Sequence, residues 1–329
     1  MNKTVRLTDG VFFQASADLS VLECALQQGV ALGYSCRTGK CGACKVRVLS
    51  GETELLGKES GLSFEDISDG FILTCCRAAK SDLELDAEDL SELKSIKIKT
   101  LPCRIDNLEL LSANVVEVVL RTPPASSLNY LPGQYVDMIG KNGLRRSYSI
   151  ANAPRKDGNI SLQIRKVGQG KMSQYWFEEA KVHDLLRMEG PLGTFFLRKS
   201  NVSQLILLAT GTGIAPIKAI LEQLSELPEN NPYSQIHLYW GGRFEQDIYW
   251  QPVFPGLPLK FTPVLSRSEA WKGRKGHVHK VLLSDNIDLG NAVVYACGSE
   301  AMIEHAFKEL VAAGLNAKNF YSDAFVSSS

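Results

Sequence analysis

Four cysteines constrain this chain more than any other feature of its sequence. Three lie within nine residues, with gaps of four and two residues between them, and the fourth follows about thirty residues later: Cys36, Cys41, Cys44 and Cys75. This is the plant-type spacing for the ligands of a 2Fe-2S cluster, which needs four thiolates converging on two iron ions. Gly39 and Gly42 give the short loop unusual backbone freedom and let main-chain N–H groups approach the sulfurs.

A zinc site is the alternative for four cysteines. Zinc sites usually contain paired C-x2-C knuckles, whereas the first gap here is four residues, so the spacing favours iron. Cys75 ends an apolar run, Phe71–Leu73, which we expect to form a strand. Strand alternation would then point the adjacent Cys76 away from the cluster. Cys24 and Cys103 are expected to be ordinary buried thiols.

The composition is that of a globular protein, and 329 residues suit two or three domains. The 36 Lys and Arg balance the 36 Asp and Glu, and zero net charge argues against nucleic acid as a partner. No stretch approaches the roughly 18 apolar residues of a membrane helix, and the N-terminus lacks the apolar segment of a secretory signal. We therefore expect a cytoplasmic protein without membrane insertion, in which the eight cysteines do not form a disulfide framework.

The first of three predicted domains covers residues 1–92. It holds the four cysteines, a short hairpin over 5–13 and a helix over 19–28 with Asp18 or Ser20 near its N-cap. Residues 45–49 alternate polar and apolar like a strand. The charged run 82–99, which has neither Gly nor Pro, is predicted to be a linker out of this domain.

The next two domains differ in the pattern of their predicted strands, turns and helices. Residues 98–200 contain short β-rich runs separated by turn signals, which is typical of an antiparallel barrel or sandwich; the runs are 115–120, 135–139, 146–150 and 160–167. From about residue 201 to 329 the order becomes strand, Gly-rich turn and helix, which predicts a parallel α/β sheet. Its buried strands are expected at 204–209, 236–240 and 292–296, with a helix over 217–224.

Net charge is distributed unevenly along the chain. Residues 1–90 contain 9 Lys and Arg against 14 Asp and Glu, so the remainder carries the balancing positive charge. One interpretation is an acidic module that docks on a more basic body. The alternative is two ordinary solvated surfaces that happen to balance.

The second motif suits a flat cofactor with a diphosphate. Strand alternation in the sequence RSYS places Arg146 and Tyr148 on one side and Ser147 and Ser149 on the other. A cation could then meet a diphosphate while a flat ring covers the cofactor; the alternative is a plain surface strand. Downstream, a Gly-rich turn opens a helix and could cradle a phosphate through its first residues, Gly170, Lys171, Met172 and Ser173.

The third motif, TGTGIAP, lies between an apolar strand and a helix, a context that aims helix N–H groups at a pyrophosphate. Its candidate binding residues are Gly211, Thr212, Gly213 and Pro216, and it is not the G-x-G-x-x-G fingerprint. Cys297 and Gly298 end a later strand that should lie beside the first, at the carboxyl edge of the sheet where ligands bind. The alternative for Cys297 is a buried small hydrophobe.

Together these motifs resemble, over essentially the full length, the ferredoxin-reductase-like electron transferases with an N-terminal 2Fe-2S domain. The sequences that carry the resemblance are RSYSIAN, GPLGTFF, GTGIAP, YACGS and FYSDAF. The resemblance implies a multidomain α+β and α/β protein: an N-terminal β-grasp ferredoxin domain, an antiparallel β-barrel FAD domain and a C-terminal parallel-sheet nicotinamide domain.

The same resemblance implies residue roles. Arg146 would bind the FAD pyrophosphate, Tyr148 would stack on the isoalloxazine, and Ser149 would lie near flavin N5. Nicotinamide would bind at the GTGIAP turn and Cys297. Phe325 would shield the flavin until nicotinamide displaces it, unless it belongs to a frayed tail with the serines 327–329.

Two departures from the family pattern affect the choice of nicotinamide. Many relatives have Gly where this chain has Thr210, and Pro-Pro where it has Ser299 and Glu300. Beyond Arg243, no basic cluster follows the second strand of the last domain to hold a 2′-phosphate, so we expect NADH rather than NADPH.

The predicted function is that of an NAD(P)H-dependent iron-sulfur flavoprotein reductase. Nicotinamide gives up two electrons as hydride and a 2Fe-2S cluster accepts one, so a flavin must stand between them. The resemblance favours a redox partner that is a pyridoxamine-phosphate-dependent CDP-4-keto-6-deoxyglucose 3-dehydrase, in 3,6-dideoxyhexose and O-antigen synthesis. The alternatives are the reductase component of a multicomponent oxygenase, and a 2Fe-2S carrier or sensor without turnover.

A basic rim around the cysteine loop is expected to be the docking face: Arg37, Lys40, Lys45 and Arg47.

Overall fold

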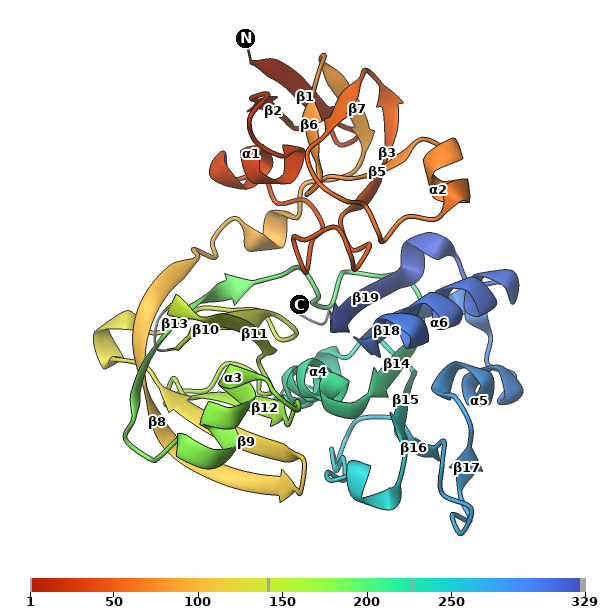
Figure 1. The fold of residues 1–329 in the computed structure, drawn as a ribbon. Coiled ribbons are helices and arrows are strands. Elements are labelled where there is room, and N and C mark those ends of the chain that lie inside the picture. The colour runs from red at the N-terminus through yellow and green to blue at the C-terminus, as the bar shows by residue number, and fades with distance from the viewer. Residues whose placement is uncertain (1, 141–142, 227, 326–329) are drawn as a thin grey trace. The chain divides into compact units, whose positions relative to one another are not determined.

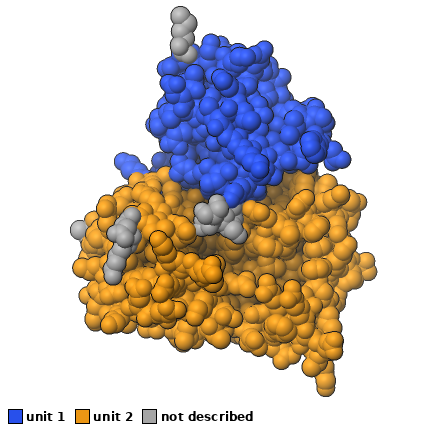
Figure 2. All heavy atoms as spheres, in the orientation of Figure 1, with its two compact units in different colours: residues 1–97, 326–329 blue, residues 98–325 orange. Residues whose placement is uncertain are grey.

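The computed structural model describes residues 2–140, 143–226 and 228–325, and these fall into two compact units, one up to residue 97 and one over residues 98–325 (Figures 1 and 2). The serines at 327–329, for which we expected disorder, lie outside the described residues. Among the described residues, no helix has the length and apolar character needed to cross a membrane.

The first unit is a five-stranded mixed sheet with one helix packed on it and a separate two-stranded sheet. The strand order is β2-β1-β7-β3-β5, in which β1 and β7 are parallel and the other pairs antiparallel. This is the β-grasp arrangement. Its elements are β1 Lys3–Leu7, β2 Phe12–Ala15, α1 Val21–Gln27, β3 Lys45–Ser50, β4 Thr53–Leu55, α2 Phe64–Ser68, β5 Phe71–Leu73, β6 Arg77–Ala79, β7 Leu83–Asp86 and the 3-10 turn η1 Ser91–Leu93.

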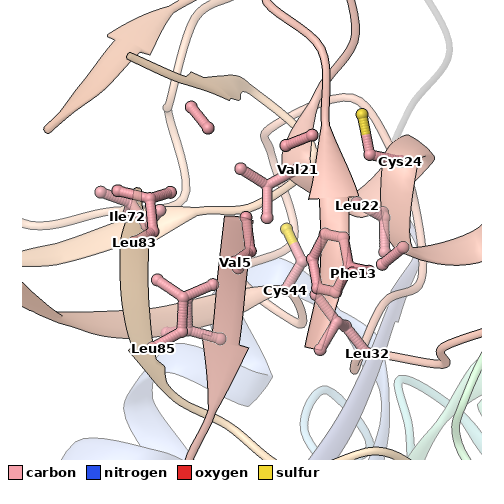
Figure 3. Close-up of a cluster of buried hydrophobic side chains, with 14 of the residues drawn as sticks. Val5, Phe13, Val21, Leu22, Cys24, Leu32, Cys44, Ile72, Leu83 and Leu85 are labelled. Carbon is pink, nitrogen blue, oxygen red and sulfur yellow. The ribbon is translucent and has the colours of Figure 1, made fainter. Parts of the chain in front are cut away.

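The core of this unit lies between α1 and the sheet. Ser20 caps α1 by accepting the N–H of Glu23, as expected from the sequence. Apolar side chains from the helix and strands fill the space, and Figure 3 shows Phe13, Leu22 and Cys44 among them. Cys44 is 3% exposed, so one predicted cluster ligand is anchored directly in the core.

The predicted linker over 82–99 is wrong at its start. Residues Leu83–Asp86 form β7, a strand inside the first unit whose leucines, Leu83 and Leu85, are buried. The charges alternate with these leucines, so they occupy the solvent side of a half-buried strand. The strand is parallel to β1, a pairing over nearly eighty residues that charge pattern alone does not predict.

The second unit begins with a six-stranded antiparallel sheet in the order β11-β10-β13-β8-β9-β12. A bridge between Ile150 and Leu162 joins its two edges, which closes the sheet into the predicted barrel. Two of its strands, β8 and β13, were not predicted. The elements are β8 Lys99–Ser112, β9 Val115–Arg121, η2 Pro124–Ser126, β10 Tyr135–Ile139, β11 Arg145–Ser149, β12 Ile160–Arg165, α3 Lys171–Gln174, the π turn η4 Tyr175–Glu179 and β13 Leu185–Leu192.

The rest of the second unit is a fully parallel sheet in the order β17-β16-β15-β14-β18-β19, with α4 on one face and α5 and α6 on the other (Figure 1). Its central strands are continuous apolar runs, as expected for strands covered on both faces. The elements are β14 Gln204–Thr210, η5 Gly211–Gly213, α4 Ile214–Glu226, η6 Pro228–Asn230, β15 Gln235–Gly242, η7 Glu245–Asp247, β16 Leu259–Leu265, β17 Arg274–Lys275, α5 Val278–Ser284, η8 Leu289–Asn291, β18 Ala292–Ser299, α6 Glu300–Ala312, η9 Ala317–Asn319 and β19 Phe320–Phe325.

Candidate functional site

The four predicted cluster ligands come together as two pairs of thiols. Cys36 and Cys41 form one pair, in which the backbone N–H of each residue lies 3.4 Å from the sulfur of the other. Cys44 and Cys75 form the second pair, with their sulfurs 3.3 Å apart. The backbone N–H of Thr38 also donates to the Cys36 sulfur, at 3.4 Å.

This arrangement fits two iron ions better than one metal ion. Each iron of a 2Fe-2S cluster takes two cysteine thiolates and two bridging sulfides, so two thiol pairs are the protein's share of the ligands. The residues present therefore fit the predicted cluster.

Each pair already holds one thiol that ionises easily. The hydrogen bond from Cys41 lowers the pKa of Cys36 to about 4, and the hydrogen bond from Cys44 lowers the pKa of Cys75 to about 7. The same bonds, with burial, raise the pKa of Cys41 and Cys44 above the ordinary thiol value. Iron binds thiolates, so a lowered pKa at Cys36 and Cys75 favours metal binding at both pairs.

Two glycines shape the cluster loop as the sequence predicts. Gly39 and Gly42 have φ values of 75° and 73°, in the left-handed region that favours glycine. At Gly39 a Cβ atom would also collide with the carbonyl of Lys58 and lie 2.5 Å from the sulfur of Cys76. The loop therefore packs closely against a second segment of the chain and against a fifth cysteine.

The RSYS strand lies in β11, paired with β10, and its side chains alternate as predicted. Tyr148 packs against the barrel core, where the Trp176 indole N–H donates to its hydroxyl at 3.1 Å and burial raises its pKa to about 12. Arg146 is half-buried, and its Nη1 donates to the carbonyl of Arg145 at 2.7 Å. The Ser147 hydroxyl donates to Asp137 at 2.6 Å, while Ser149 is buried.

The Gly-rich turn opens α3 at Gly170, as predicted. Met172 and Ser173 are buried, Met172 in the barrel core, and the N–H of Val167 donates to the Ser173 hydroxyl at 2.8 Å. The side chains of Met172 and Ser173 therefore stabilise the barrel. A phosphate here would be met by backbone N–H groups and by the exposed Lys171.

The third motif places its residues at one edge of the parallel sheet. The turn η5 follows β14, and β18 pairs with β14 so that Cys297 lies opposite Ala209. The carbonyl of Cys297 packs directly against Gly213, where a Cβ would collide with it. Cys297 is fully buried, and burial raises the pKa of its thiol well above the usual value, so the thiol stays protonated.

The two departures from the family pattern, Thr210 and Ser299, touch each other at this edge. The backbone N–H of Ser299 donates to the Thr210 hydroxyl at 3.3 Å. Ser299 also caps α6 by accepting the N–H of Met302. A proline at position 299 would have no N–H to donate to the Thr210 hydroxyl. The contact therefore depends on both Thr210 and a residue other than proline at position 299.

Comparison with known proteins agrees with this order of sites. Residues 6–80 match the family described as 2Fe-2S iron-sulfur cluster binding domain, 102–197 the oxidoreductase FAD-binding domain, and 207–308 the oxidoreductase NAD-binding domain. The chain is 42% identical to the CDP-6-deoxy-L-threo-D-glycero-4-hexulose-3-dehydrase reductase of Yersinia pestis, over the whole of both chains. It belongs to this family of iron-sulfur flavoprotein reductases.

The reductase also resembles proteins that serve oxygenases. It is 31% identical to the toluate 1,2-dioxygenase electron transfer component of Pseudomonas putida, with 97% of each chain covered. The crystal structure of the Amycolatopsis cytochrome P450 reductase GcoB has a TM-score of 0.75 and 26% identity, over 99% of this chain and 100% of that one. The reductase is thus an NAD(P)H-dependent oxidoreductase with FAD and 2Fe-2S domains.

Phe325 lies at the same sheet edge as the nicotinamide motif. It is the last residue of β19 and pairs in register with Ser299 at the end of β18. The residue is 40% exposed, which is unusual for a large apolar residue in a strand of this sheet. Its predicted role as a shield for the flavin stays a prediction, but its place in a strand rules out a frayed tail as far as Phe325.

The prediction for Cys76 is wrong. The chain does not continue as a strand through Cys75; it turns between β5 and β6, and the Cys76 N–H donates to the Leu73 carbonyl at 2.8 Å. The sulfur of Cys76 therefore lies 3.6 Å from that of Cys75 instead of facing away from it. A turn between two three-residue strands leaves no strand alternation to apply.

The basic rim around the cluster loop carries less free charge than the sequence suggests. Arg37 forms an ion pair with Glu23 at 2.7 Å, and Lys45 forms one with Asp66 at 2.9 Å. Arg47 donates to the carbonyl of Asp69 at 3.0 Å. Since two of the four cations are neutralised within the domain, the rim does not support docking by positive charge alone.

Proposed function

We propose that the reductase passes electrons from NADH to a pyridoxamine-phosphate-dependent dehydrase that acts on CDP-4-keto-6-deoxyglucose, in 3,6-dideoxyhexose synthesis in the cytoplasm. The observation that carries this proposal is the 42% identity over the whole of both chains with a dehydrase reductase, against 31% with an oxygenase component. A bound FAD would supply the chemistry that links a two-electron hydride donor to a one-electron acceptor such as a 2Fe-2S cluster.

The protein's own residues would bind and orient the cofactors. Cys36 and Cys41 would hold one iron, and Cys44 and Cys75 the other, because they form the two thiol pairs. Arg146 binds the FAD diphosphate with the backbone N–H groups at the start of α3, while Tyr148 and Ser149 contact the flavin ring. At the sheet edge, nicotinamide is met by the following residues: Gly211, Thr212, Gly213, Pro216, Cys297 and Gly298. Phe325, at the end of the neighbouring strand, covers the flavin in its absence.

The partner is tested by reconstitution. The purified reductase is mixed with NADH, CDP-4-keto-6-deoxyglucose and a purified pyridoxamine-phosphate-dependent 3-dehydrase, and the 3-deoxygenated sugar nucleotide is measured. We expect product only when both proteins and NADH are present, at a rate that rises with reductase concentration. A dehydrase proved competent with a chemical reductant, yet giving no product with this reductase, would contradict the proposal. Brisk turnover with an oxygenase component instead would favour the alternative partner.

NADH is the proposed electron donor. One feature near the end of β15 favours NADH over NADPH, and a second feature favours NADPH. Glu245, just beyond β15, accepts a hydrogen bond from Ser268 at 3.2 Å; a carboxylate at this edge can bind a ribose hydroxyl and repels a 2′-phosphate. Against this, the N–H of Arg267 donates to the Arg243 carbonyl at 3.0 Å, which brings a second arginine to the loop. Strand pairing of β15 with β16, not the sequence order, creates this arginine pair.

We expect kcat/KM to be at least about tenfold higher with NADH than with NADPH, a difference of ~1.4 kcal/mol. Glu245→Gln should narrow that ratio by removing the repulsion. Arg267→Ala should lower the residual activity with NADPH and leave activity with NADH unchanged. Steady-state rates with a dye acceptor give kcat/KM for NADH and for NADPH in each protein. A preference of the unmodified protein for NADPH would contradict the assignment.

A further inference from the structure

Among the residues that the structure describes, Cys76 is the one cysteine that lies against a predicted cluster ligand without belonging to either thiol pair. Its sulfur is 3.6 Å from the Cys75 sulfur and 3.6 Å from the carbonyl oxygen of Lys58. The residue is only 5% exposed. Its backbone is fixed on both sides, since its N–H donates to Leu73 and its carbonyl accepts the N–H of Leu56, both at 2.8 Å.

The packing around Cys76 leaves its sulfur little room to move. Gly39 lies so close that a Cβ there would be 2.5 Å from the Cys76 sulfur, and a Cβ at Gly57 would be 4.0 Å from it. The cluster loop and the segment before β6 therefore hold the thiol between them. Close packing by Gly39 and the Lys58 carbonyl therefore restricts the position of the Cys76 sulfur beside Cys75.

We propose that the Cys76 thiol donates a hydrogen bond to the Cys75 thiolate and thereby raises the reduction potential of the 2Fe-2S cluster. A cysteine that ligates iron is a thiolate and can only accept, so the direction of the bond is set by ligation. A donor to a ligating sulfur stabilises the more negative, reduced cluster, and hydrogen bonds to the sulfurs are one of the main determinants of such potentials. Cys76 is thus a positioning and tuning residue for Cys75.

The carbonyl of Lys58 is the competing acceptor at the same distance. A thiolate carries a negative charge and a carbonyl does not, and charge-assisted hydrogen bonds are the stronger ones. Once iron is bound, the Cys75 sulfur is therefore the preferred acceptor. The inference rests on the proposed ligand role of Cys75 but is independent of the proposed partner and of the choice of nicotinamide.

The test compares the midpoint potential of the cluster in the complete protein with that in Cys76→Ala and Cys76→Ser. Potentials are measured by redox titration followed by the EPR signal of the reduced cluster, with iron and sulfide content determined for each protein. Cys24→Ala is the matched control, because Cys24 is a buried thiol of the same domain whose sulfur lies 3.9 Å from the Ser16 hydroxyl. It loses a thiol without losing a contact to Cys75.

We expect Cys76→Ala to retain the cluster and to have a more negative potential. At the midpoint of the unmodified protein, its ratio of reduced to oxidised cluster should fall roughly two- to fivefold, as expected for loss of one weak hydrogen bond. Cys76→Ser, which keeps a donor, should recover most of the difference, and Cys24→Ala should not change the potential.

Three outcomes would overturn the inference. Equal potentials for Cys76→Ala and the unmodified protein, at equal cluster content, would assign the thiol to the Lys58 carbonyl. An equal shift in Cys24→Ala would assign the effect to general packing. Loss of the cluster in both Cys76 variants would make Cys76 a ligand or a structural requirement. If Cys75→Ala kept a normal cluster, the proposed ligand set itself would fail, which is distinguishable from all three.

Discussion

The Cys41→Ser variant is expected to lose electron transfer to a protein acceptor while NADH still reduces its flavin. The change breaks the pair that Cys41 forms with Cys36, and ligand loss should reduce transfer to the partner by at least about a hundredfold, since even outer-shell changes often cost roughly 10–100-fold in metal affinity. The flavin and nicotinamide domains lie in a separate compact unit, residues 98–325, so they should fold without the cluster.

Three measurements on the same preparation check this prediction. Iron and FAD analysis should show loss of iron with FAD retained. Anaerobic bleaching of the flavin by NADH, and reduction of a small dye that accepts electrons from flavin, should stay within about twofold, because the cluster comes after the flavin in the proposed order of carriers. Cys24→Ala should behave like the unmodified protein throughout. Full activity of Cys41→Ser with the protein acceptor would contradict the proposed order of carriers.

The motifs with fixed spacing could be predicted from sequence because their chemistry is local. A loop proposed to ligate iron through Cys36, Cys41 and Cys44 needs its glycines, and the turn after β14 needs Gly211 and Gly213 between a strand and a helix. Residues close together in the sequence meet these requirements, so the loop and the strand–turn–helix segment were predicted correctly. The all-parallel sheet and the barrel follow in the same way from the alternation of short segments.

The sequence could not show pairings between distant segments. The parallel pairing of β7 with β1 turned an expected linker into a strand, and the pairing of β15 with β16 brought Arg267 beside Arg243. The ion pair of Arg37 with Glu23 likewise removed charge from an expected docking face. Each depends on register between elements that no local pattern specifies.

Departures from a family pattern proved informative once the structure was known. Thr210 and Ser299 are 89 residues apart and were two unrelated substitutions in the sequence. In the structure the hydroxyl of one accepts the N–H of the other, so neither can be exchanged for the family residue without affecting its partner. A search for paired departures could have found this contact from an alignment of relatives.

The second large effect is expected at Arg146. Arg146→Ala should weaken FAD binding by roughly 10–150-fold, the loss expected for a hydrogen bond to a charged group worth about 1.5–3 kcal/mol. The guanidinium has five N–H donors, and its bond to the Arg145 carbonyl leaves others for a diphosphate. FAD affinity is measured by titrating flavin-free protein with FAD and following the quenching of flavin fluorescence.

The chain offers a matched control in the neighbouring arginine. Arg145 lies on the other face of β11, where it forms an exposed ion pair with Glu189 at 3.0 Å; surface pairs are worth little, so Arg145→Ala should change FAD affinity less than about fivefold.

Ser149→Ala separates binding from chemistry, because it removes a donor near the flavin ring and not a phosphate anchor: FAD should stay bound while reduction by NADH slows. Equal and mild effects of Arg146→Ala and Ser149→Ala would mean that the cofactor is misplaced on this strand. Equal losses of FAD from Arg145→Ala and Arg146→Ala would instead show that general positive charge, not one face of β11, retains the diphosphate.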